Sequence, residues 1–210
     1  FSYYLNADVA KYDAIIVPSE GVFDELKKLN ANKVFSVHFG VDPDLYLPLC
    51  LEQNIDVFFF ATSDSDRESE VSMMISEPST KIDARFLVSG IKYNTDLKKA
   101  KKIPMLPFSL WRYYACRSKI NLNITRERHA CTYTSTSRPF ELAAMECCIV
   151  SHPYKGLDKW FTLGKEMFVV ENVKEAIETY AWLLDDDETR RKVGSNARQR
   201  VLKEHTFRQR

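Results

Sequence analysis

Apolar runs alternate with helical patterns along most of this chain, and this alternation constrains the fold more than any other feature. The runs are continuously apolar instead of alternating apolar with polar residues, which is typical of strands that are covered on both faces of a sheet. Strands that alternate with helices in this way form a parallel sheet with helices packed on each side. The sequence therefore predicts an α/β protein with a doubly wound parallel sheet.

Eight short runs have the composition of buried strands, and they are residues 13–19, 33–39, 55–61, 84–90, 103–106, 119–124, 147–151 and 167–170. The first helical pattern follows Ser19, a residue type that can cap a helix. The other helical patterns are residues 69–76, 109–117, 138–146, 173–185 and 188–205. We expect the helix at 69–76 to end before Pro78, because proline interrupts the interior of a helix.

The first two strands and the helix between them form a βαβ unit that is too small to bury both faces of its own strands. Its partner strands are expected before Phe1, and a start at Phe rather than Met indicates a fragment. The predicted organisation is the end of an N-terminal domain with its linker at 1–48, a second domain at 49–187, and an outer, mostly charged helix at 188–210.

Charge and cysteine usage exclude several classes of protein. The 30 Lys and Arg residues nearly balance the 29 Asp and Glu residues, so no overall field points to nucleic acid or to a membrane surface. No apolar run approaches the roughly 20 residues that span a bilayer. The five cysteines form no CxxC pair, and Cys147 and Cys148 lie in an apolar run that suits buried hydrophobes better than metal ligands. We expect a reduced, cytoplasmic protein without a metal site.

Residues 121–150, NLNITRERHACTYTSTSRPFELAAMECCIV, predict a strand, a polar loop, a helix and a second strand. Hydroxyl groups and unpaired backbone N–H groups at the start of a helix can surround a phosphate. The hydroxyl residues here are Ser135, Thr136 and Ser137, and Arg138 beside them is a further candidate ligand for phosphate. The same hydroxyls can instead act only as helix caps. Glu141 can accept hydrogen bonds from a sugar, or can simply stabilise the N-terminus of its own helix.

Three stretches resemble one family of enzymes. KYDAIIVPSEGVFDEL with KVFSVHFGVDPDLYLP resembles the last strand–helix–strand of the N-terminal domain in GT-B glycosyltransferases. RPFELAAMECCIV resembles the donor motif of their C-terminal domain, and residues 164–207 resemble its closing strand and two helices. Within the glycosyl transferases of group 1 and related proteins, the nearest group is the CgeB-type, spore-protein glycosyltransferase-like set. It shares an Arg-x-Phe-Glu opening and a closing His-Thr-aromatic sequence.

The resemblance implies two Rossmann-like domains, of which the first binds the acceptor and the second binds the nucleotide sugar. This chain would hold the tail of the first domain and the whole of the second. The implied reaction transfers a sugar, of hexosyl type, from a UDP or GDP sugar to an acceptor hydroxyl without a cofactor or metal. The implied acceptor is a glycan, a lipid or a small molecule, and membrane contact would be made through the first domain. We expect the fragment alone to be inactive.

Two residues carry the catalytic roles that the resemblance implies. Glu141 matches the glutamate that accepts from both ribose hydroxyls. Arg67 follows the first strand of the second domain and would stabilise the leaving diphosphate, although an ion pair with a neighbouring acid is the alternative for it. Further residues are expected to contact the nucleotide, and they are Ser63, Ser65, Leu106, Phe108, Arg126, Ser135, Thr136, Ser137 and Arg138.

The sequence departs from the family pattern at Tyr133, which stands where retaining members carry a second glutamate, eight positions before Glu141. The retaining or inverting outcome therefore stays open, as do the base, the sugar and the acceptor. Two other functions remain on the same architecture. One is a non-catalytic nucleotide-binding or scaffold protein, and the other is an enzyme similar to nucleotide-sugar 2-epimerases. A generic doubly wound binding module is the alternative to all of these, because a fold does not fix a function.

Overall fold

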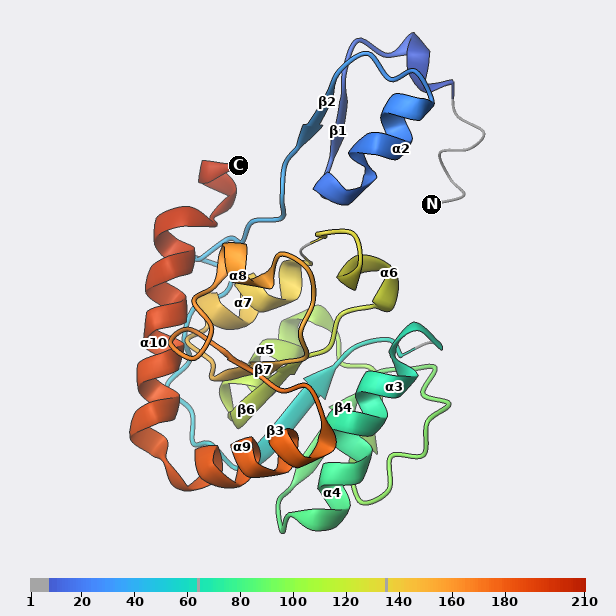
Figure 1. Ribbon diagram of the computed structural model, residues 1–210. Coiled ribbons are helices and arrows are strands. Elements are labelled where there is room, and N and C mark those ends of the chain that lie inside the picture. The colour runs from blue at the N-terminus through green and yellow to red at the C-terminus, as the bar shows by residue number, and fades with distance from the viewer. Residues whose placement is uncertain (1–7, 64, 135) are drawn as a thin grey trace.

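Parallel strands form two separate sheets, a two-stranded one near the N-terminus and a six-stranded one in the rest of the chain (Figure 1). The computed structural model describes residues 8–63, 65–134 and 136–210. We refer to residues 8–39 as the N-terminal unit, 40–54 as the linker, 55–204 as the larger unit and 205–210 as the C-terminal tail. The six strands of the larger unit are all parallel and follow the order β5-β4-β3-β6-β7-β8. The predicted α/β fold with a doubly wound sheet is confirmed.

The N-terminal unit contains β1 (Ile15–Val17), paired with β2 (Val34–Ser36), and both strands are shorter than predicted. Its helices are η1 (Val9–Lys11), η2 (Glu20–Val22) and α2 (Phe23–Lys28). These helices bury one face of the pair around Val17 and Leu26. On the opposite face, Ile16 and Phe35 lie side by side in register and are 67% and 51% exposed. The N-terminal unit thus covers only one side of its sheet.

Ser19 does not cap the helix that follows it, which corrects the prediction for this residue. As the N-cap of η2, it makes no side-chain capping hydrogen bond. Its hydroxyl donates instead to the carbonyl oxygen of Thr132 in the larger unit. The Ser19 hydroxyl thus bonds a distant backbone carbonyl and not the N–H groups of its own helix, and the sequence around Ser19 does not predict this partner.

The large sheet contains all six strands predicted for it, and they are β3 (Ile55–Phe60), β4 (Phe86–Ser89), β5 (Lys101–Ile103), β6 (Ser118–Asn123), β7 (Ile149–Ser151) and β8 (Phe168–Val169). The strand predicted at 103–106 is displaced toward the N-terminus. Pro104 explains the shift, because proline has no N–H to donate to a strand ladder. The carbonyl of Pro104 accepts a hydrogen bond from the Ser89 hydroxyl at 2.8 Å, so the chain is held by a side chain after the strand ends.

Helices cover both faces of this sheet. The helical elements are η3 (Ser65–Arg67), α3 (Glu68–Val71), the π-helical η4 (Ser72–Ser76), α4 (Glu77–Lys81), α5 (Phe108–Cys116), α6 (Glu127–Ala130), α7 (Ser137–Ala144), α8 (Leu157–Trp160), α9 (Val173–Asp185), α10 (Asp187–Glu204) and η5 (Phe207–Gln209). The helix expected to stop before Pro78 continues through η4 into α4, so that prediction is wrong. Pro78 lies in the first turn of α4, just after the π-helical η4, so its missing N–H falls where the regular α-helical hydrogen-bond ladder is already interrupted.

Successive residues of β3 belong to different cores, as the two-residue period of a strand requires. Phe58 packs with Trp111 of α5 and Phe140 of α7, in a cluster that α10 completes. Val57 and Phe59 pack on the other side, in a cluster formed with α3, η4 and α9. The central strands are therefore buried on both faces, which explains why their sequences read as continuous apolar runs.

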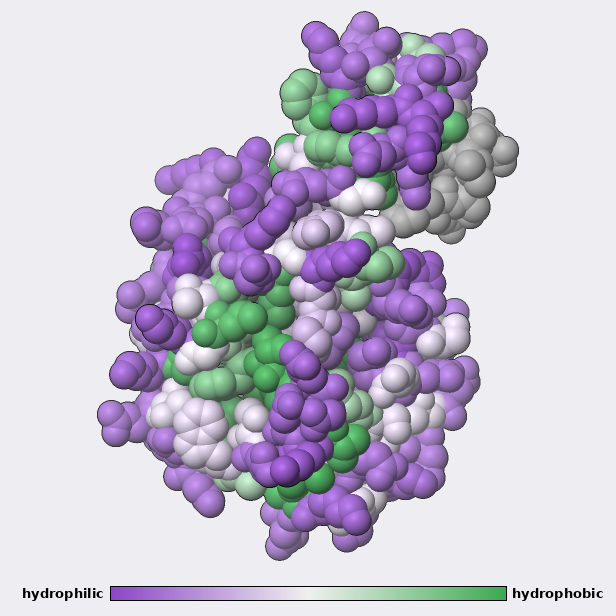
Figure 2. Space-filling view, in the orientation of Figure 1, coloured by the Kyte–Doolittle hydropathy of each residue, from purple (hydrophilic) through white to green (hydrophobic). Residues whose placement is uncertain are grey.

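The last helix, α10, packs along α7 and contributes to the core with one face only. Ala197 and Val201 are fully buried in the cluster of α5 and α7. The outer residues of α10 are charged, and hydrophilic side chains dominate its side of the surface in Figure 2. Gly194 lies against the backbone of Glu146, where a Cβ atom would come within 2.2 Å of the carbonyl oxygen. This contact sets how closely α10 approaches the end of α7.

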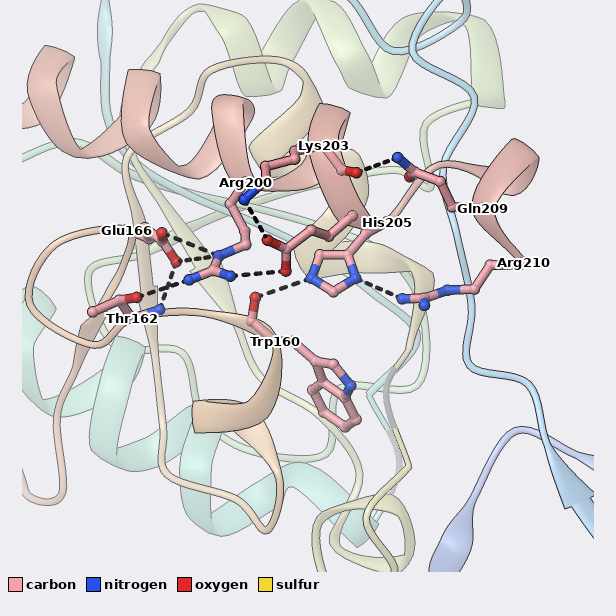
Figure 3. Close-up of polar contacts among 9 residues, drawn as sticks. Trp160, Thr162, Glu166, Arg200, Lys203, His205, Gln209 and Arg210 are labelled. Atoms are coloured by element: carbon pink, nitrogen blue, oxygen red, sulfur yellow. Dashed lines mark hydrogen bonds and ion pairs between the residues drawn. The ribbon is translucent and has the colours of Figure 1, made fainter.

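The C-terminal tail returns to the linker and binds it through the backbone. Val41 donates its N–H to the carbonyl of His205 at 3.0 Å, and its own carbonyl accepts from Phe207 at 3.1 Å. Figure 3 shows His205 between the carbonyl of Trp160 and the guanidinium of Arg210, at 3.2 and 2.5 Å. The sequence Gly-Val-Asp-Pro and the closing His-Thr-Phe, which both contributed to the resemblance, therefore contact each other.

We predict that Gly194→Ala lowers the free energy of unfolding by about 1–3 kcal/mol, because the added methyl group overpacks the contact with Glu146. Alanine in an open helix position would instead raise stability by up to about 1 kcal/mol. Urea denaturation measures the change, with Gln199→Ala on the exposed side of α10 as the matched control. Equal stability of Gly194→Ala and wild type would mean that α10 is not held at this distance.

Candidate functional site

The strand order places a cavity at the carboxyl ends of β3 and β6. At these neighbouring strands the strand order reverses, because β4 and β5 are added on one side of the pair and β7 and β8 on the other. Loops diverge at such a point and leave a crevice for ligands. A cavity of about 250 Å³ occupies it, and the described residues that line it are residues 59–62, Arg67, Met105, residues 123–124, Arg126 and residues 136–138.

The cavity is strongly positive. Among the described residues that line it, Arg67, Arg126 and Arg138 are basic and none is acidic. Nearby, burial and the charges of Arg126, Arg67 and Arg128 lower the pKa of His129. The imidazole of His129 therefore stays neutral at pH 7 and does not add to the repulsion among the arginines. An arrangement of this kind favours a ligand with several negative charges.

Arg67 connects the carboxyl ends of the two central strands. Its Nε donates to the carbonyl of Ile124 at 2.9 Å, and its Nη1 donates to the carbonyl of Thr62. Asp66, the acid directly before Arg67 in the sequence, forms an ion pair with Arg128. The guanidinium is thus fixed at the wall of the cavity by backbone oxygens that follow β3 and β6.

Arg138 lies over two aromatic rings. Its guanidinium carbon is 4.1 Å from the centre of the Trp111 ring and 4.7 Å from that of Phe60, and these two rings stack at 5.5 Å with an angle of 7° between their planes. Burial lowers the pKa of Arg138 and the nearby Glu141 carboxylate opposes that effect, so the guanidinium stays charged. Stacking on aromatic rings holds the cation in place without using its hydrogen-bond donors.

Glu141 is adjacent to Arg138 and reaches back to the linker. Its Oε2 is 3.7 Å from Nε of Arg138, and its Oε1 accepts a hydrogen bond from the Tyr46 hydroxyl at 3.1 Å. The side chain of Glu141 is 12% exposed. Phe108 packs edge-on against the ring of Tyr46, with 5.7 Å between ring centres, and is 55% exposed. A carboxylate and an exposed aromatic ring therefore both contact Tyr46, and the carboxylate also lies beside Arg138, which lines the cavity.

The hydroxyl groups that the sequence singled out divide into two sets. Thr136 and Ser137 line the cavity at the start of α7, a helix with no side-chain cap and no acid in its first turn. Ser63 is buried and Ser65 is exposed, and neither is among the described residues that line the cavity. Ser135 lies outside the described residues. The free N–H groups of α7 thus face the same space as two hydroxyls and three arginines.

Leu106 is half-buried and its N–H donates to the Ser89 hydroxyl at 3.1 Å. It packs against the core on the α5 side rather than lining the cavity, where Met105 lies instead. Of the pair proposed to contact a nucleobase, only Phe108 presents a large exposed surface. The backbone around residue 106 is held by the side chain of a neighbouring strand, which fixes the start of α5.

Tyr133 lies on the surface, with 37% of the residue exposed. Its backbone φ is +53°, in the left-handed region that non-glycine residues seldom adopt. Its ring lies under the ammonium groups of Lys159 and Lys155, at 5.0 and 6.0 Å, and it is not among the described residues lining the cavity. Its surroundings are the surface near Gly156 rather than the arginine cluster.

The loop that leads into α7 is bonded to the N-terminal unit. The N–H of Gly21 donates to the carbonyl of Thr132 at 3.1 Å, and Ser19 forms an antiparallel bridge with Thr134. A Cβ at Gly21 would lie 2.4 Å from that same carbonyl oxygen, so only glycine allows this approach. Lys159 and Glu20 add an ion pair at 2.7 Å. The position of this loop, and so the start of α7, depends on the N-terminal unit.

His152 holds the backbone next to the cavity, and no role was predicted for it from the sequence. Its Nε2 accepts a hydrogen bond from the N–H of Thr125 at 3.1 Å, which fixes the backbone directly before Arg126. Burial, and to a lesser degree Arg67, lowers the pKa of His152 to about 4. A neutral imidazole is required there, because a protonated ring nitrogen could not accept this hydrogen bond. The signal that could have found it is a histidine directly after a strand that ends at the site.

Within the described part of the chain, no group of three or more His, Cys, Asp or Glu side chains is arranged to hold a metal ion. Across the same residues, no helix has the length and apolar character needed to cross a membrane.

The sequence profile of the glycosyl transferase-like family matches residues 67–210, which include the cavity arginines, Glu141 and α10. The chain belongs to this family. No curated protein gives a significant sequence match. The predicted kinship with GT-B glycosyltransferases is confirmed by this family and by the fold of the structures described next.

Solved glycosyltransferase structures share the fold at low sequence identity. Sucrose-phosphate synthase from Thermosynechococcus elongatus has a TM-score of 0.74 at 12% identity, over 95% of this chain and 56% of its own. TarM of S. aureus, in a complex that includes UDP, has a TM-score of 0.75 at 14% identity, over 98% of this chain and 43% of its own. HepE of Anabaena, in complex with UDP and glucose, has a TM-score of 0.70 at 10% identity, over 92% and 59%. This chain spans about half the length of these proteins of the same fold.

We predict that protonation of His152 destabilises the fold between about pH 6.5 and pH 4. The unfolded state takes up a proton near pH 6.5 while the native state resists until about pH 4, so stability falls as the pH drops through this window. The loss attributable to His152 at pH 4 is about 3 kcal/mol. Urea unfolding at several pH values measures it.

His152→Gln is the matched variant, because its amide oxygen can still accept from Thr125 but does not titrate. The carboxylates that also respond to acid are the same in both proteins. We expect the variant to lose less stability than wild type between pH 7 and pH 4. Parallel pH profiles for the two proteins would contradict the assignment.

Proposed function

We propose that the chain is the donor-binding part of a glycosyltransferase that takes its sugar from a nucleotide-diphosphate sugar. The observation that carries the proposal is the convergence of Arg67, Arg126 and Arg138 with the start of α7 in one cavity, at the carboxyl ends of β3 and β6. Arginine offers planar, bidentate hydrogen bonds that match phosphate oxygens. The N-terminus of a helix adds N–H donors and a favourable dipole for the same group.

The size of the cavity suits a diphosphate better than a whole nucleotide sugar. Its volume of about 250 Å³ is below the roughly 300–1,000 Å³ of pockets that enclose a complete small molecule. The remaining parts of the donor would therefore extend beyond it. The nucleoside would lie toward Glu141 and Phe108, with the ribose at the carboxylate and the base against the exposed ring. The sugar would lie on the side of the N-terminal unit.

Two of the structures with this fold favour uridine nucleotides as the first ligands to test. TarM was solved with UDP and HepE with UDP and glucose. The exposed Phe108 ring can stack on or flank any base, so this residue alone does not select one. The backbone around Met105 and Leu106 would supply the contacts that tell bases apart.

In the proposed reaction, the oxygen of an acceptor hydroxyl forms a bond to the anomeric carbon, and the bond from that carbon to the diphosphate oxygen breaks. The electron pair of the broken bond goes to the nucleoside diphosphate, and the proton of the acceptor hydroxyl passes to the released diphosphate or to water. Arg67, Arg126 and Arg138 would stabilise this developing charge, which is the electrostatic mode of catalysis. Because Arg67 is fixed by two backbone carbonyls, its charge needs no reorganisation during the step.

Tyr133 is the observation that favours a second function, a nucleotide-binding protein without transfer. It has no carboxylate to offer where retaining enzymes of this fold carry one, and its ring packs under lysines. A 2-epimerase-like enzyme would also keep the nucleotide site. Transfer requires an acceptor and releases UDP, whereas epimerisation converts one nucleotide sugar into another without an acceptor and releases none. Analysis of both free UDP and the nucleotide sugar after incubation of UDP-glucose with the full-length protein, with and without added glycan acceptors, therefore separates the three functions.

We predict selective binding of one nucleotide in a calorimetric titration of the chain with UDP, GDP, ADP and TDP. Arg126→Met should weaken the diphosphate at least tenfold and leave the nucleoside nearly unchanged, because hydrogen bonds to charged groups contribute about 1.5–3 kcal/mol. Arg191→Met is the matched control, since Arg191 is an exposed arginine that pairs with Asp187 far from the cavity. Glu141→Ala should weaken the nucleoside and the diphosphate alike.

Absence of binding at millimolar concentration by both this chain and a full-length protein would overturn the proposal of a donor site. Equal losses for Arg126→Met and Arg191→Met would show only an unspecific attraction to positive charge. Binding without transfer by the full-length protein would support the scaffold function instead.

A further inference from the structure

Both oxygens of the Glu141 carboxylate face a partner inside the protein. Oε1 accepts from the Tyr46 hydroxyl at 3.1 Å, and Oε2 faces Nε of Arg138 at 3.7 Å. Glu141 is on α7, whereas Tyr46 is on the linker, 95 residues away in the chain. A carboxylate that is only 12% exposed needs such partners, because an unpaired charge is costly to bury.

Tyr46 itself is held firmly. It is 5% exposed, and its ring packs against Phe108 at 5.7 Å and against Trp111 at 5.8 Å between ring centres. The backbone beside it is fixed by Arg112, whose Nη1 donates to the carbonyl of Leu45 at 2.8 Å. Burial and the nearby Glu141 raise the pKa of Tyr46, so its hydroxyl remains a neutral donor at physiological pH. The donor that meets Oε1 therefore has a defined position.

The Glu141 carboxylate can accept more hydrogen bonds than these two contacts use. Each carboxylate oxygen has two lone pairs that can accept a hydrogen bond. One lone pair on Oε1 is taken by Tyr46, and the contact of Oε2 with Arg138 is longer than a hydrogen bond. At least one acceptor position is left on each oxygen, in an orientation that Tyr46 and Arg138 determine. Two vicinal hydroxyls of a ribose match such a pair.

We propose that Tyr46 is a positioning residue for ribose recognition, which orients the Glu141 carboxylate toward the two hydroxyls of a bound nucleoside diphosphate. This inference rests on the proposed function, because it needs a nucleotide beside the arginine cavity. It adds that the linker, and not only the larger unit, determines how well the protein tells a ribonucleotide from a deoxyribonucleotide.

The test compares UDP with 2′-deoxy-UDP by calorimetric titration of wild type, Tyr46→Phe and Glu141→Gln. If GDP is the nucleotide selected by the wild type, GDP and 2′-deoxy-GDP replace them. Wild type should prefer the ribonucleotide about tenfold or more, because the lost hydrogen bond has a charged acceptor. Tyr46→Phe should reduce that preference by about threefold or more and leave the affinity for 2′-deoxy-UDP nearly unchanged.

Tyr180→Phe is the matched control. Tyr180 is also a buried tyrosine with one hydrogen bond, in which its hydroxyl donates to the carbonyl of Met74 at 3.0 Å on the other side of the sheet. This control should lose stability and keep the full preference for ribose. The double variant Tyr46→Phe/Glu141→Gln should show no further loss beyond Glu141→Gln alone, as expected for residues that act through one contact.

Equal weakening of UDP and 2′-deoxy-UDP by Tyr46→Phe would overturn the inference and leave Tyr46 a purely structural residue. The proposed function would survive that result, because the wild type would still bind a nucleotide. If neither this chain nor the full-length protein binds any of UDP, GDP, ADP and TDP, the proposed function and this inference are both wrong.

Discussion

The parallel pairing of β3 with β6 determines where everything else in the site can lie. The other strands add outward on either side of this pair, so the loops that leave β3 and β6 separate and open a crevice. Arg67 spans this crevice by bonding the carbonyls that follow each of the two strands. Positive charge is thereby attached to the backbone beside the cavity that the diverging loops leave open. Arg126 and Arg138 line the same opening and add to its positive charge.

The fold could be predicted because its information is local. A strand buried on both faces must be apolar throughout, and β3, β4 and β7 carry that pattern in the sequence. Two of the errors are also local and concern proline, whereas the error at Ser19 comes from a long-range partner. Pro104 shifts the strand predicted around it toward the N-terminus, while Pro78 lies just after the π-helical η4, in the first turn of α4, and does not end the helix. Whether a proline ends an element depends on its position within that element, and the sequence alone does not fix that position.

The candidate site was predictable only in part, for a related reason. Thr136, Ser137 and Arg138 are consecutive, so a helix start places them together, and Arg67 and Arg126 each follow a central strand. Tyr46 could not be found in this way, because its contact with Glu141 depends on how the linker crosses the larger unit. His152 was missed since a buried neutral histidine looks the same in sequence as an exposed one. Local pattern predicts which residues a strand end carries, and tertiary packing decides what they meet.

The contact between Val41 and the C-terminal tail has a consequence for the modularity of this chain. Residues 41 and 206 form a parallel bridge, so the intervening residues leave and re-enter one point as a single closed loop. Units whose ends lie together tolerate circular permutation and insertion into other proteins. The segment from Val41 to Thr206, which contains the larger unit, is therefore suited to being cut out as one piece, joined through a short connection between these two ends, and reopened at a surface loop. Such a permuted protein would keep the central β3–β6 pairing, because neither strand lies near the new junction.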